Sequence, residues 1–269
     1  MADSYISGQN YTALTTPVLA ATVYAAQETS LFLGGALVPI VQAPNGILQV
    51  PELAAVTATT ITSGITTDVA ITNPSQTKND ITTDLYAARA VVRDLGNIDP
   101  AEIGRALGKA VATKFDSDVY AALDSATAST TDSVPLSVDD MFDAVAQIRS
   151  AGESGQLFGV LSPNQGTVLM KDIGTAAYAG GDFQSEALRT GYIGNIAGVQ
   201  MFMSSNVGVG DAGKAGYIFG TDAMRIAMQQ NVSVEVARRA EAVGVDVVAS
   251  LMAKPGLVDA TRAVRLINV

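Results

Sequence analysis

Residues 99–127 read DPAEIGRALGKAVATKFDSDVYAALDSAT and predict the clearest helix of the chain. Asp99 is a typical N-cap residue, Pro100 suits the first helical position, and Glu102 completes the pattern of a capping box. Apolar residues recur every fourth position, at Ile103, Leu107, Val111, Phe115, Val119 and Leu123. Because a helical turn holds 3.6 residues, this stripe winds slowly around the helix. We therefore expect a helix of about 25 residues and about 40 Å that contacts different partners along its length.

The region before this helix has the alternating pattern of β-strands. Residues 47–92 alternate Thr with Val, Ile and Ala, and Ser63-Gly64 and Asn73-Pro74 supply turn residues. The pattern predicts a long, Thr-rich β-hairpin with too little apolar surface to be stable alone. A hairpin at the edge of the protein's own sheet is the alternative.

The N-terminal part of the chain is unusual in its charge. No Lys or Arg occurs before Lys78, and few acidic residues precede it. A globular surface usually mixes both signs of charge, so this segment is expected to lie against another surface. Its composition, rich in Thr, Ala, Gly and Pro, shows no helical apolar stripe with caps. We therefore expect a segment without a core of its own that becomes ordered when neighbouring subunits cover it.

The region after the long helix predicts a mixed α+β arrangement. A second helix begins at an N-cap, Ser137, and stops at Gly152, and a third follows Ser162-Pro163. The predicted strands are LFGVL, VQMFMSS, AGYIFG, MRIAM, VSVEVAR, GVDVVASLMA and AVRLINV. The last strands can return to an earlier sheet, and the fold class is therefore α+β.

Composition narrows the possible functions. The chain has 269 residues, 48% of them hydrophobic, which is enough for one large domain or two intimate ones. It has no Cys and no His, which excludes a cysteine nucleophile, a thiolate or imidazole metal site and a histidine base. The net charge of −10 argues against sequence-specific binding of nucleic acid. The N-terminus lacks a basic signal region, and the apolar run 31–41 is too short to span a membrane, so a soluble intracellular protein is expected.

One glycine-rich motif imitates a phosphate-binding loop. GVGDAGKA contains Gly208, Gly213 and Lys214 at the P-loop spacing, but Ala215 replaces the Ser or Thr that binds Mg²⁺. The motif also requires a helix after it, whereas AGYIFG is typical of a strand. We interpret these glycines as a connection between two strands.

Two further patterns resemble catalytic sites. SQTK at Ser75–Lys78 matches the Ser-x-x-Lys of penicillin-recognising enzymes, but it lies in a strand-rich region without the companion motifs. Paired carboxylates occur at Asp116/Asp118, Asp139/Asp140 and Asp182/Glu186. A glycosidase needs two such groups across a cleft and usually aromatic residues for the sugar, whereas aromatic residues are 6% of this chain. We expect these carboxylates to lie on solvated helix faces or to favour helix N-termini.

Two stretches resemble a known family. GYIGNIAGVQMFMSSNV, at 191–207, looks like a glycine-spaced entry into a strand that ends in small polar residues. NVSVEVARRAEAVGVDVVASLMAKPGLVDATRAVRLINV, at 231–269, looks like a V-x-V-E strand, a turn, a long element and a closing strand. Their order after a hairpin and a long helix resembles the major capsid proteins of tailed bacteriophages, the Hong Kong 97 type.

The resemblance implies a division of the chain into named units. An N-terminal arm would cover 1–46, an extended β-hairpin loop 47–92, and a peripheral domain with the long spine helix 93–157. An axial domain would cover 158–238, and 239–269 would return to the peripheral domain. The arm and the loop would reach over neighbouring subunits, and GVGDAGK would lie near the capsomer axis.

The resemblance also implies partners and an absence of catalysis. Copies of the chain would form the hexamers and pentamers of an icosahedral shell around double-stranded DNA, which they contact non-specifically. A scaffolding protein, a portal and a decoration protein are implied partners, and assembly would take place in the host bacterial cytoplasm before the protein resides in the virion. No long N-terminal scaffolding segment is present, which implies a separate scaffold or prior cleavage. No enzyme activity, cofactor, metal or membrane is implied. The expected assembly-interface residues are Val56, Thr60, Ile61, Thr66, Ile71, Lys78, Gly208 and Lys214.

Other functions compatible with the sequence are an encapsulin-like shell around protein cargo and a Lys- or carboxylate-based hydrolase or nucleotide-binding enzyme. The enzyme hypothesis requires either the P-loop-like motif or the Ser-x-x-Lys motif to adopt the geometry that its chemistry needs. The cargo shell requires only the shared fold.

Overall fold

The computed structural model describes residues 11–53, 58, 60, 76–93, 99–132, 136–173, 194–207 and 214–268. The helices are α1 (Tyr11–Thr29), α2 (Pro100–Leu123), α3 (Val138–Ser150) and α4 (Pro163–Ile173). The strands are β1 (Ile40–Gln42), β2 (Ile47–Leu53), β3 (Gln76–Thr82), β4 (Asp84–Arg93), β5 (Ala128–Asp132), β6 (Leu157–Leu161), β7 (Asn195–Ile196), β8 (Val199–Met203), β9 (Lys214–Gly220), β10 (Met224–Arg239), β11 (Gly244–Leu257) and β12 (Ala263–Asn268). Short 3-10 turns, Ala240–Ala242 and Ala260–Arg262, precede β11 and β12.

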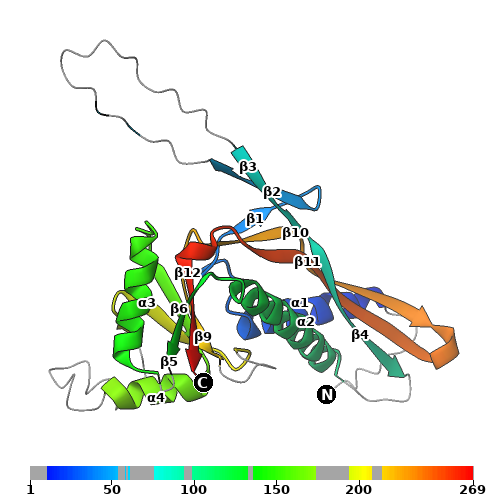
Figure 1. The fold of residues 1–269 in the computed structure, drawn as a ribbon. Coiled ribbons are helices and arrows are strands. Elements are labelled where there is room, and N and C mark those ends of the chain that lie inside the picture. Colours follow the sequence, from blue (N-terminus) through cyan, green and yellow to red (C-terminus); the bar gives the residue numbers. More distant parts are fainter. Residues whose placement is uncertain are drawn as a thin grey trace, which may run out of the picture.

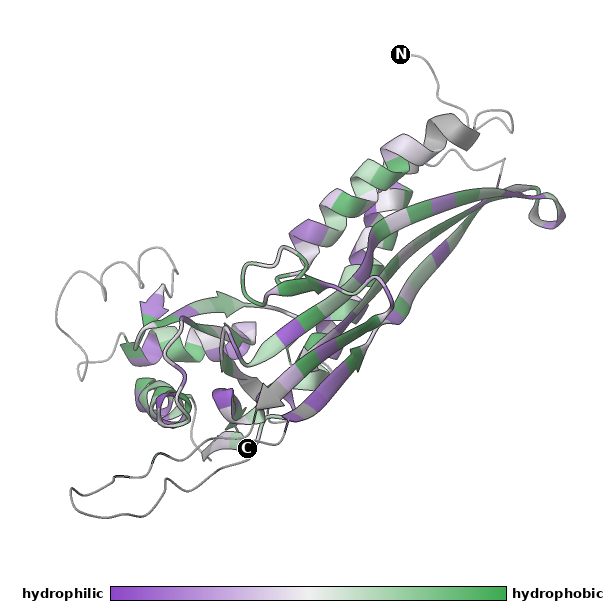
Figure 2. Ribbon diagram, turned by 90° about the horizontal axis from the view of Figure 1, so that it is seen from above, coloured by the Kyte–Doolittle hydropathy of each residue, from purple (hydrophilic) through white to green (hydrophobic). Residues whose placement is uncertain are grey.

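The strands form two main sheets and one separate ribbon. The order of the first sheet is β1-β10-β11-β4, that of the second is β5-β12-β9-β6-β8-β7, and β2 pairs only with β3. Figure 1 shows the six-stranded sheet with α3 and α4 on one side of α2, and the long strands of the four-stranded sheet extending away on the other. Seen from above in Figure 2, α1 runs alongside these long strands.

Helix α2 has the bounds that its sequence predicts. The Asp99 side chain accepts a hydrogen bond of 3.0 Å from the Ala101 N–H, which satisfies one donor of the first turn. The expected reciprocal bond of a capping box is not formed by Glu102, so this acidic residue acts only through its favourable place in the first turn. All six residues of the predicted apolar stripe are buried, from Ile103 to Leu123.

The N-terminal segment differs from its prediction, because residues 11–29 form helix α1 and pack on α2. The contact is close at two glycines of α2: a Cβ added to Gly104 would be 2.6 Å from the Val18 carbonyl oxygen, and one added to Gly108 would be 2.3 Å from that of Thr22. The absence of side chains at these positions lets the two backbones approach. Val18, Ala25 and Ala26 are buried in α1.

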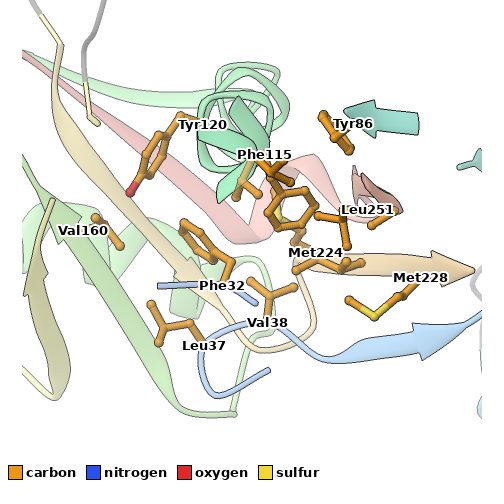
Figure 3. Packing of buried hydrophobic residues seen from close by; sticks show 14 of the residues in the cluster. Phe32, Leu37, Val38, Tyr86, Phe115, Tyr120, Val160, Met224, Met228 and Leu251 are labelled. Carbon is orange, nitrogen blue, oxygen red and sulfur yellow. The ribbon is translucent and has the colours of Figure 1, made fainter. Parts of the chain in front are cut away.

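The main hydrophobic core lies between α2, the four-stranded sheet and the segment that follows α1. Figure 3 shows Phe32, Leu37 and Val38 of that segment beside Phe115 and Met224. Phe32 is fully buried, and its ring meets Tyr120 edge-on with 5.6 Å between centroids. The expectation that neighbouring subunits would cover this segment is therefore wrong for residues 30–43, which fill part of the subunit's own core.

A second core lies under the six-stranded sheet. Strand β6 is buried along its whole length, between β9 and β8, and helix α3 contributes Met141, Ala144 and Ile148. A complete capping box begins α3: the Ser137 hydroxyl accepts from the Asp140 N–H, and the Asp140 carboxylate accepts from the Ser137 N–H. The predicted second and third helices are thus confirmed.

Sheet membership does not follow the segment boundaries drawn from the sequence. Strand β10, which joins the predicted MRIAM and VSVEVAR strands through two register shifts, belongs to the four-stranded sheet although most of it falls within 158–238. Strand β12 lies in the six-stranded sheet, parallel to β5 and antiparallel to β9, although it falls within 239–269. The names peripheral and axial for these parts stay predictions.

Candidate assembly surfaces

The β2–β3 ribbon projects from the body of the subunit (Figure 1). The two strands are antiparallel, with Ile47 opposite Thr82 and Leu53 opposite Gln76. The ribbon is separate from both larger sheets, so its backbone ladder receives no support from them. Two-stranded ribbons are only marginally stable in water, and the contacts at the root of this one therefore decide its direction.

The root of the ribbon is fixed by one apolar contact and a few hydrogen bonds. Ile81 is buried against Ala43 and Ala227, and it lies so close to Gly256 that a Cβ there would be 2.4 Å from Ile81 Cδ1. The Asn79 side chain donates to the Leu257 carbonyl at 3.2 Å. An open groove of about 450 Å³ lies beside this root, between β3 and the end of β11.

Beyond the root, the described side chains of the ribbon are mostly exposed. Ile47 exposes 47% of its surface, and Gln49, Pro51, Lys78 and Asp80 are also exposed. Apolar and polar side chains alternate along this ribbon. No described element of the same chain covers them beyond the root. The ribbon is thus a surface that another molecule can cover.

The four-stranded sheet has one covered and one open face. On the covered face, Tyr86 and Leu251 are buried towards α2, where the Tyr86 ring meets Phe115 with 5.6 Å between centroids. On the open face, Leu85 exposes 59% and Val91 44% of its surface. The ion pair of Arg89 with Asp246 lies on this open face as well. Strand β4 is an edge strand of the sheet, so its outer backbone groups are also unpaired by any described strand.

The far end of this sheet carries charges and an exposed apolar residue. The turn between β10 and β11 places Val243 in the left-handed region, with φ of 45°, and exposes 60% of it. Arg93 is exposed at the end of β4, opposite Gly244 in the register, and Arg239 pairs loosely with Glu241 at 3.8 Å. This turn thus exposes one apolar side chain beside charged residues of both signs.

Only three of the predicted interface residues lie in the part of the chain that the structure describes. Lys78 lies exposed on β3, Thr60 is exposed, and Lys214 begins β9. Val56, Ile61, Thr66, Ile71 and Gly208 lie outside the described residues. The role of these residues in assembly stays a prediction. The open face of the β4–β11 pair was missed by the sequence reasoning, although the alternation in DLYAARAVVR is its signal.

The catalytic-looking motifs lack the geometry that their chemistry requires. The strand predicted after Lys214 is confirmed: β9 pairs with β6 and β12, so no helix N-terminus follows the glycine-rich stretch. Lys78 lies on a strand, where it cannot face a residue one helical turn away. Gly213 and Ser75 lie outside the described residues.

The carboxylates have separate roles. Asp139 and Asp140 lie in the first turn of α3, and Asp118 pairs with Lys114 at 2.6 Å. Asp116 is fully buried, so the expectation of a solvated position for it is wrong; Asp182 and Glu186 lie outside the described residues. Over the described ranges, no three Asp or Glu residues are grouped to hold a metal ion. No described helix is both long and apolar enough to cross a membrane.

Lys214→Ala is expected to leave any response to nucleotide unchanged. A strand that begins at Lys214 offers no cluster of helix-terminal N–H groups for phosphate, so ATP with Mg²⁺ should shift the melting temperature of neither protein. Thermal melts with and without ATP and Mg²⁺ measure this. A saturable stabilisation of the parent protein that the variant loses would contradict the prediction.

A comparison with family models gives one match, described as phage capsid protein, over residues 101–266. The chain belongs to this family. It is a major capsid protein, a structural component of a bacteriophage shell. The match covers nearly all of α2 and the elements from β5 to most of β12, whereas α1, the β2–β3 ribbon and β4 precede it. A comparison with curated proteins finds no match.

Solved structures share the fold of this capsid protein at low sequence identity. A structure from Microbacterium phage Oxtober96 is 15% identical with a TM-score of 0.70, over 90% of this chain and 91% of that one. One from Mycobacterium phage Che8 is 19% identical with a TM-score of 0.67, over 82% and 84%. A virus-like particle from Pyrococcus furiosus is 13% identical with a TM-score of 0.63, over 96% and 99%. The α+β, Hong Kong 97-type fold expected from the sequence is confirmed.

Proposed function

We propose that copies of this capsid protein assemble into the hexamers and pentamers of an icosahedral head by placing the β2–β3 ribbon of one subunit on its neighbour. The observation that carries this is the ribbon itself, a two-stranded projection whose outer side chains are uncovered in the subunit. Its described strands, ILQVPEL and QTKNDIT, offer an exposed Ile47 together with polar and charged side chains to a partner.

The open sheet face is the partner surface proposed for the ribbon. Leu85 and Val91 are large apolar side chains exposed on β4, and the outer backbone groups of this edge strand are unpaired by any described strand, so an added strand could pair with β4 and cover both side chains. The ribbon and the open face are different surfaces of one chain, so the contact is head-to-tail. Repeated around an axis, a head-to-tail contact closes a ring, as a hexamer or pentamer requires.

The other proposed partners are those of a phage head. The head encloses double-stranded DNA, which a subunit of net charge −10 contacts non-specifically and weakly. A scaffolding protein, a portal and a decoration protein complete the assembly, which takes place in the host bacterial cytoplasm. The protein acts as a structural element and has no enzymatic role.

Replacing residues 54–75 by a short Gly-Ser turn is expected to give a folded subunit that forms no closed shells. This variant keeps Ile81 and Asn79, which fix the ribbon root, so the cores should be unaffected. Circular dichroism and melting temperature report folding, and negative-stain electron microscopy reports shells. The control replaces Lys109, which is exposed on α2 and belongs neither to the ribbon nor to the open sheet face, by Ala. Shells of normal size from the shortened variant would refute the proposed role of the ribbon.

An encapsulin-like shell around protein cargo is the second candidate, because the shared fold also occurs in a particle described as virus-like, from Pyrococcus furiosus, and a shared fold alone does not decide what a shell contains. The two candidate shells differ in what they enclose. Nuclease-protected double-stranded DNA in shells purified from infected or induced cells supports the genome shell, and a co-purified protein without such DNA supports the cargo shell.

A further inference from the structure

Asp116 occupies a junction of three segments inside the subunit. It projects from α2, and its side chain exposes none of its surface. The Ser30 hydroxyl, at the end of α1, donates a hydrogen bond of 2.5 Å to Asp116 Oδ1. The Leu31 N–H and the side chain of Asn206, a residue that follows β8, also face this carboxyl group and act to lower its pKa. One carboxylate thus connects the long helix with the N-terminal segment and with the end of a strand from the six-stranded sheet.

The Ser30 contact organises the turn that leads from α1 into the core. The Ser30 hydroxyl oxygen accepts hydrogen bonds from the N–H groups of Phe32 and Leu33, each at 3.2 Å. Phe32 then enters the core and packs on Tyr120, one helical turn after Asp116 on α2. Figure 3 shows these two rings side by side beneath α2. The buried carboxyl group of Asp116 therefore lies where the N-terminal segment attaches to α2, so the cost of burying a charge there falls on this attachment.

The surroundings of Asp116 disfavour a negative charge. Its second oxygen, Oδ2, is buried without a hydrogen-bond partner, and no described basic side chain pairs with the group. An ionised carboxylate without a cation is costly in such a site. Burial raises the pKa of Asp116 to about 6, although the hydrogen bonds from Ser30, Asn206 and Leu31 act in the opposite direction.

Asp116 is the group at this junction whose protonation changes near neutral pH, because the groups that face it do not titrate there. On its own helix, Tyr120 is buried, and this burial raises the pKa of the phenol, which stays neutral through the relevant range. The N-terminal segment faces Asp116 with Ser30 and the Leu31 N–H, and the end of β8 faces it with Asn206. None of these groups titrates between pH 4 and 8.

We propose that Asp116 is a proton-operated lock that fastens residues 30–43 to α2, tight when its carboxyl group is protonated and looser when it is ionised. The sign follows from linkage: the folded subunit holds this proton up to about pH 6, whereas an unfolded chain releases it near 3.8. Between pH 3.8 and about 6 the folded state binds more protons than the unfolded state. The attachment therefore strengthens as the pH falls from 6 towards 3.8 and weakens as the pH rises over the same range. This device belongs to the single subunit and does not depend on the proposed assembly contacts.

Hydrogen exchange of the unassembled subunit at pH 5 and pH 7.5, corrected for the intrinsic pH dependence of exchange, tests the lock. Amides of residues 30–43 in the parent protein should open more at pH 7.5, by about 10-fold, because only the part of the pKa shift that lies between pH 5 and about 6 is titrated between these two conditions. Asp116→Asn, which keeps the shape and removes the charge, should remove this pH dependence. Asp118→Asn, two residues away and half-exposed beside Lys114, should keep it.

A second variant changes Ser30, the hydrogen-bond donor to Asp116. Ser30→Ala removes the hydrogen bond that favours the ionised carboxylate, so the midpoint of the pH dependence should move above that of the parent protein. The lock is refuted if Asp116→Asn retains the parent's pH dependence, or if the Ser30→Ala midpoint stays unchanged or falls. It is supported if the dependence disappears in the first variant and moves upward in the second.

Discussion

Val111→Asp is expected to abolish the soluble subunit. Val111 exposes 2% of its surface and lies at the middle of the buried stripe of α2, inside the main core. The substitution puts a carboxylate without a cation among apolar side chains, which costs about 4 kcal/mol or more. Domains are stable by only about 5–15 kcal/mol, so most of the stability is lost. The fraction of protein in the soluble extract, followed by circular dichroism of anything recovered, measures this effect.

Ala110→Asp is the matched control for this prediction. It introduces the same residue one position earlier on the same helix, but Ala110 is exposed. The control variant should therefore stay soluble and melt within a few degrees of the parent. A well-folded Val111→Asp subunit would mean that this part of α2 is not packed within the subunit, and the main core described above would then be incorrect.

Helix α2 was predictable because its local signals and its tertiary contacts agree. Asp99 and Pro100 fix its start, and the apolar stripe matches the buried face from Ile103 to Leu123. The same agreement holds at the start of α3, where Ser137 and Asp140 form the capping box. Where cap, period and burial coincide, the sequence is sufficient to place an element.

Helix α1 was not predictable from such signals. Pro17 lies inside it, β-branched Thr and Val residues are frequent, and apolar residues lie on all sides of the helix. Its stability comes from the surface of α2, and in particular from Gly104 and Gly108, where the two backbones meet. The spacing of these glycines, four residues apart on a predicted helix, is the signal that would have indicated a closely packed helix partner.

The charge pattern was informative but incomplete. The lack of basic residues before Lys78 indicated a segment that lies against another surface, which is correct for residues 15–43 but not for the exposed strand β2. For residues 11–43 much of that surface belongs to the same subunit, as the burial of Phe32 and Val38 shows. Charge alone cannot distinguish a contact within a chain from one between copies, because both remove side chains from water. Asp116 shows the converse: its side chain lies off the six-residue stripe, yet α1 and the turn after it widen the buried face of α2.

Gly108→Ala is expected to destabilise the subunit by about 1–3 kcal/mol and to detach α1 from α2. The added Cβ would be 2.3 Å from the Thr22 carbonyl oxygen and 3.1 Å from Thr22 Cα, and these are backbone atoms that cannot rotate away. Alanine also favours a helix over glycine by about 1 kcal/mol, so the change would be stabilising if α1 were absent. The sign of the effect therefore reports whether α1 lies on α2 in solution. Melting temperature gives the sign, and limited digestion with chymotrypsin gives the location, since trypsin has no site before Lys78.

Gly34→Ala is the control for this variant, because a Cβ at Gly34 meets no atom within 4 Å. It should leave both the melting temperature and the digestion pattern close to those of the parent. In the Gly108→Ala variant, by contrast, cleavage near Tyr24 should become faster as α1 moves away, and Val18 and Ala26 lose their cover. A Gly108→Ala subunit that melts higher than the parent and resists chymotrypsin equally would show that α1 is not seated on these glycines. The N-terminal segment would then be free to cover a neighbouring subunit, as its charge pattern first indicated.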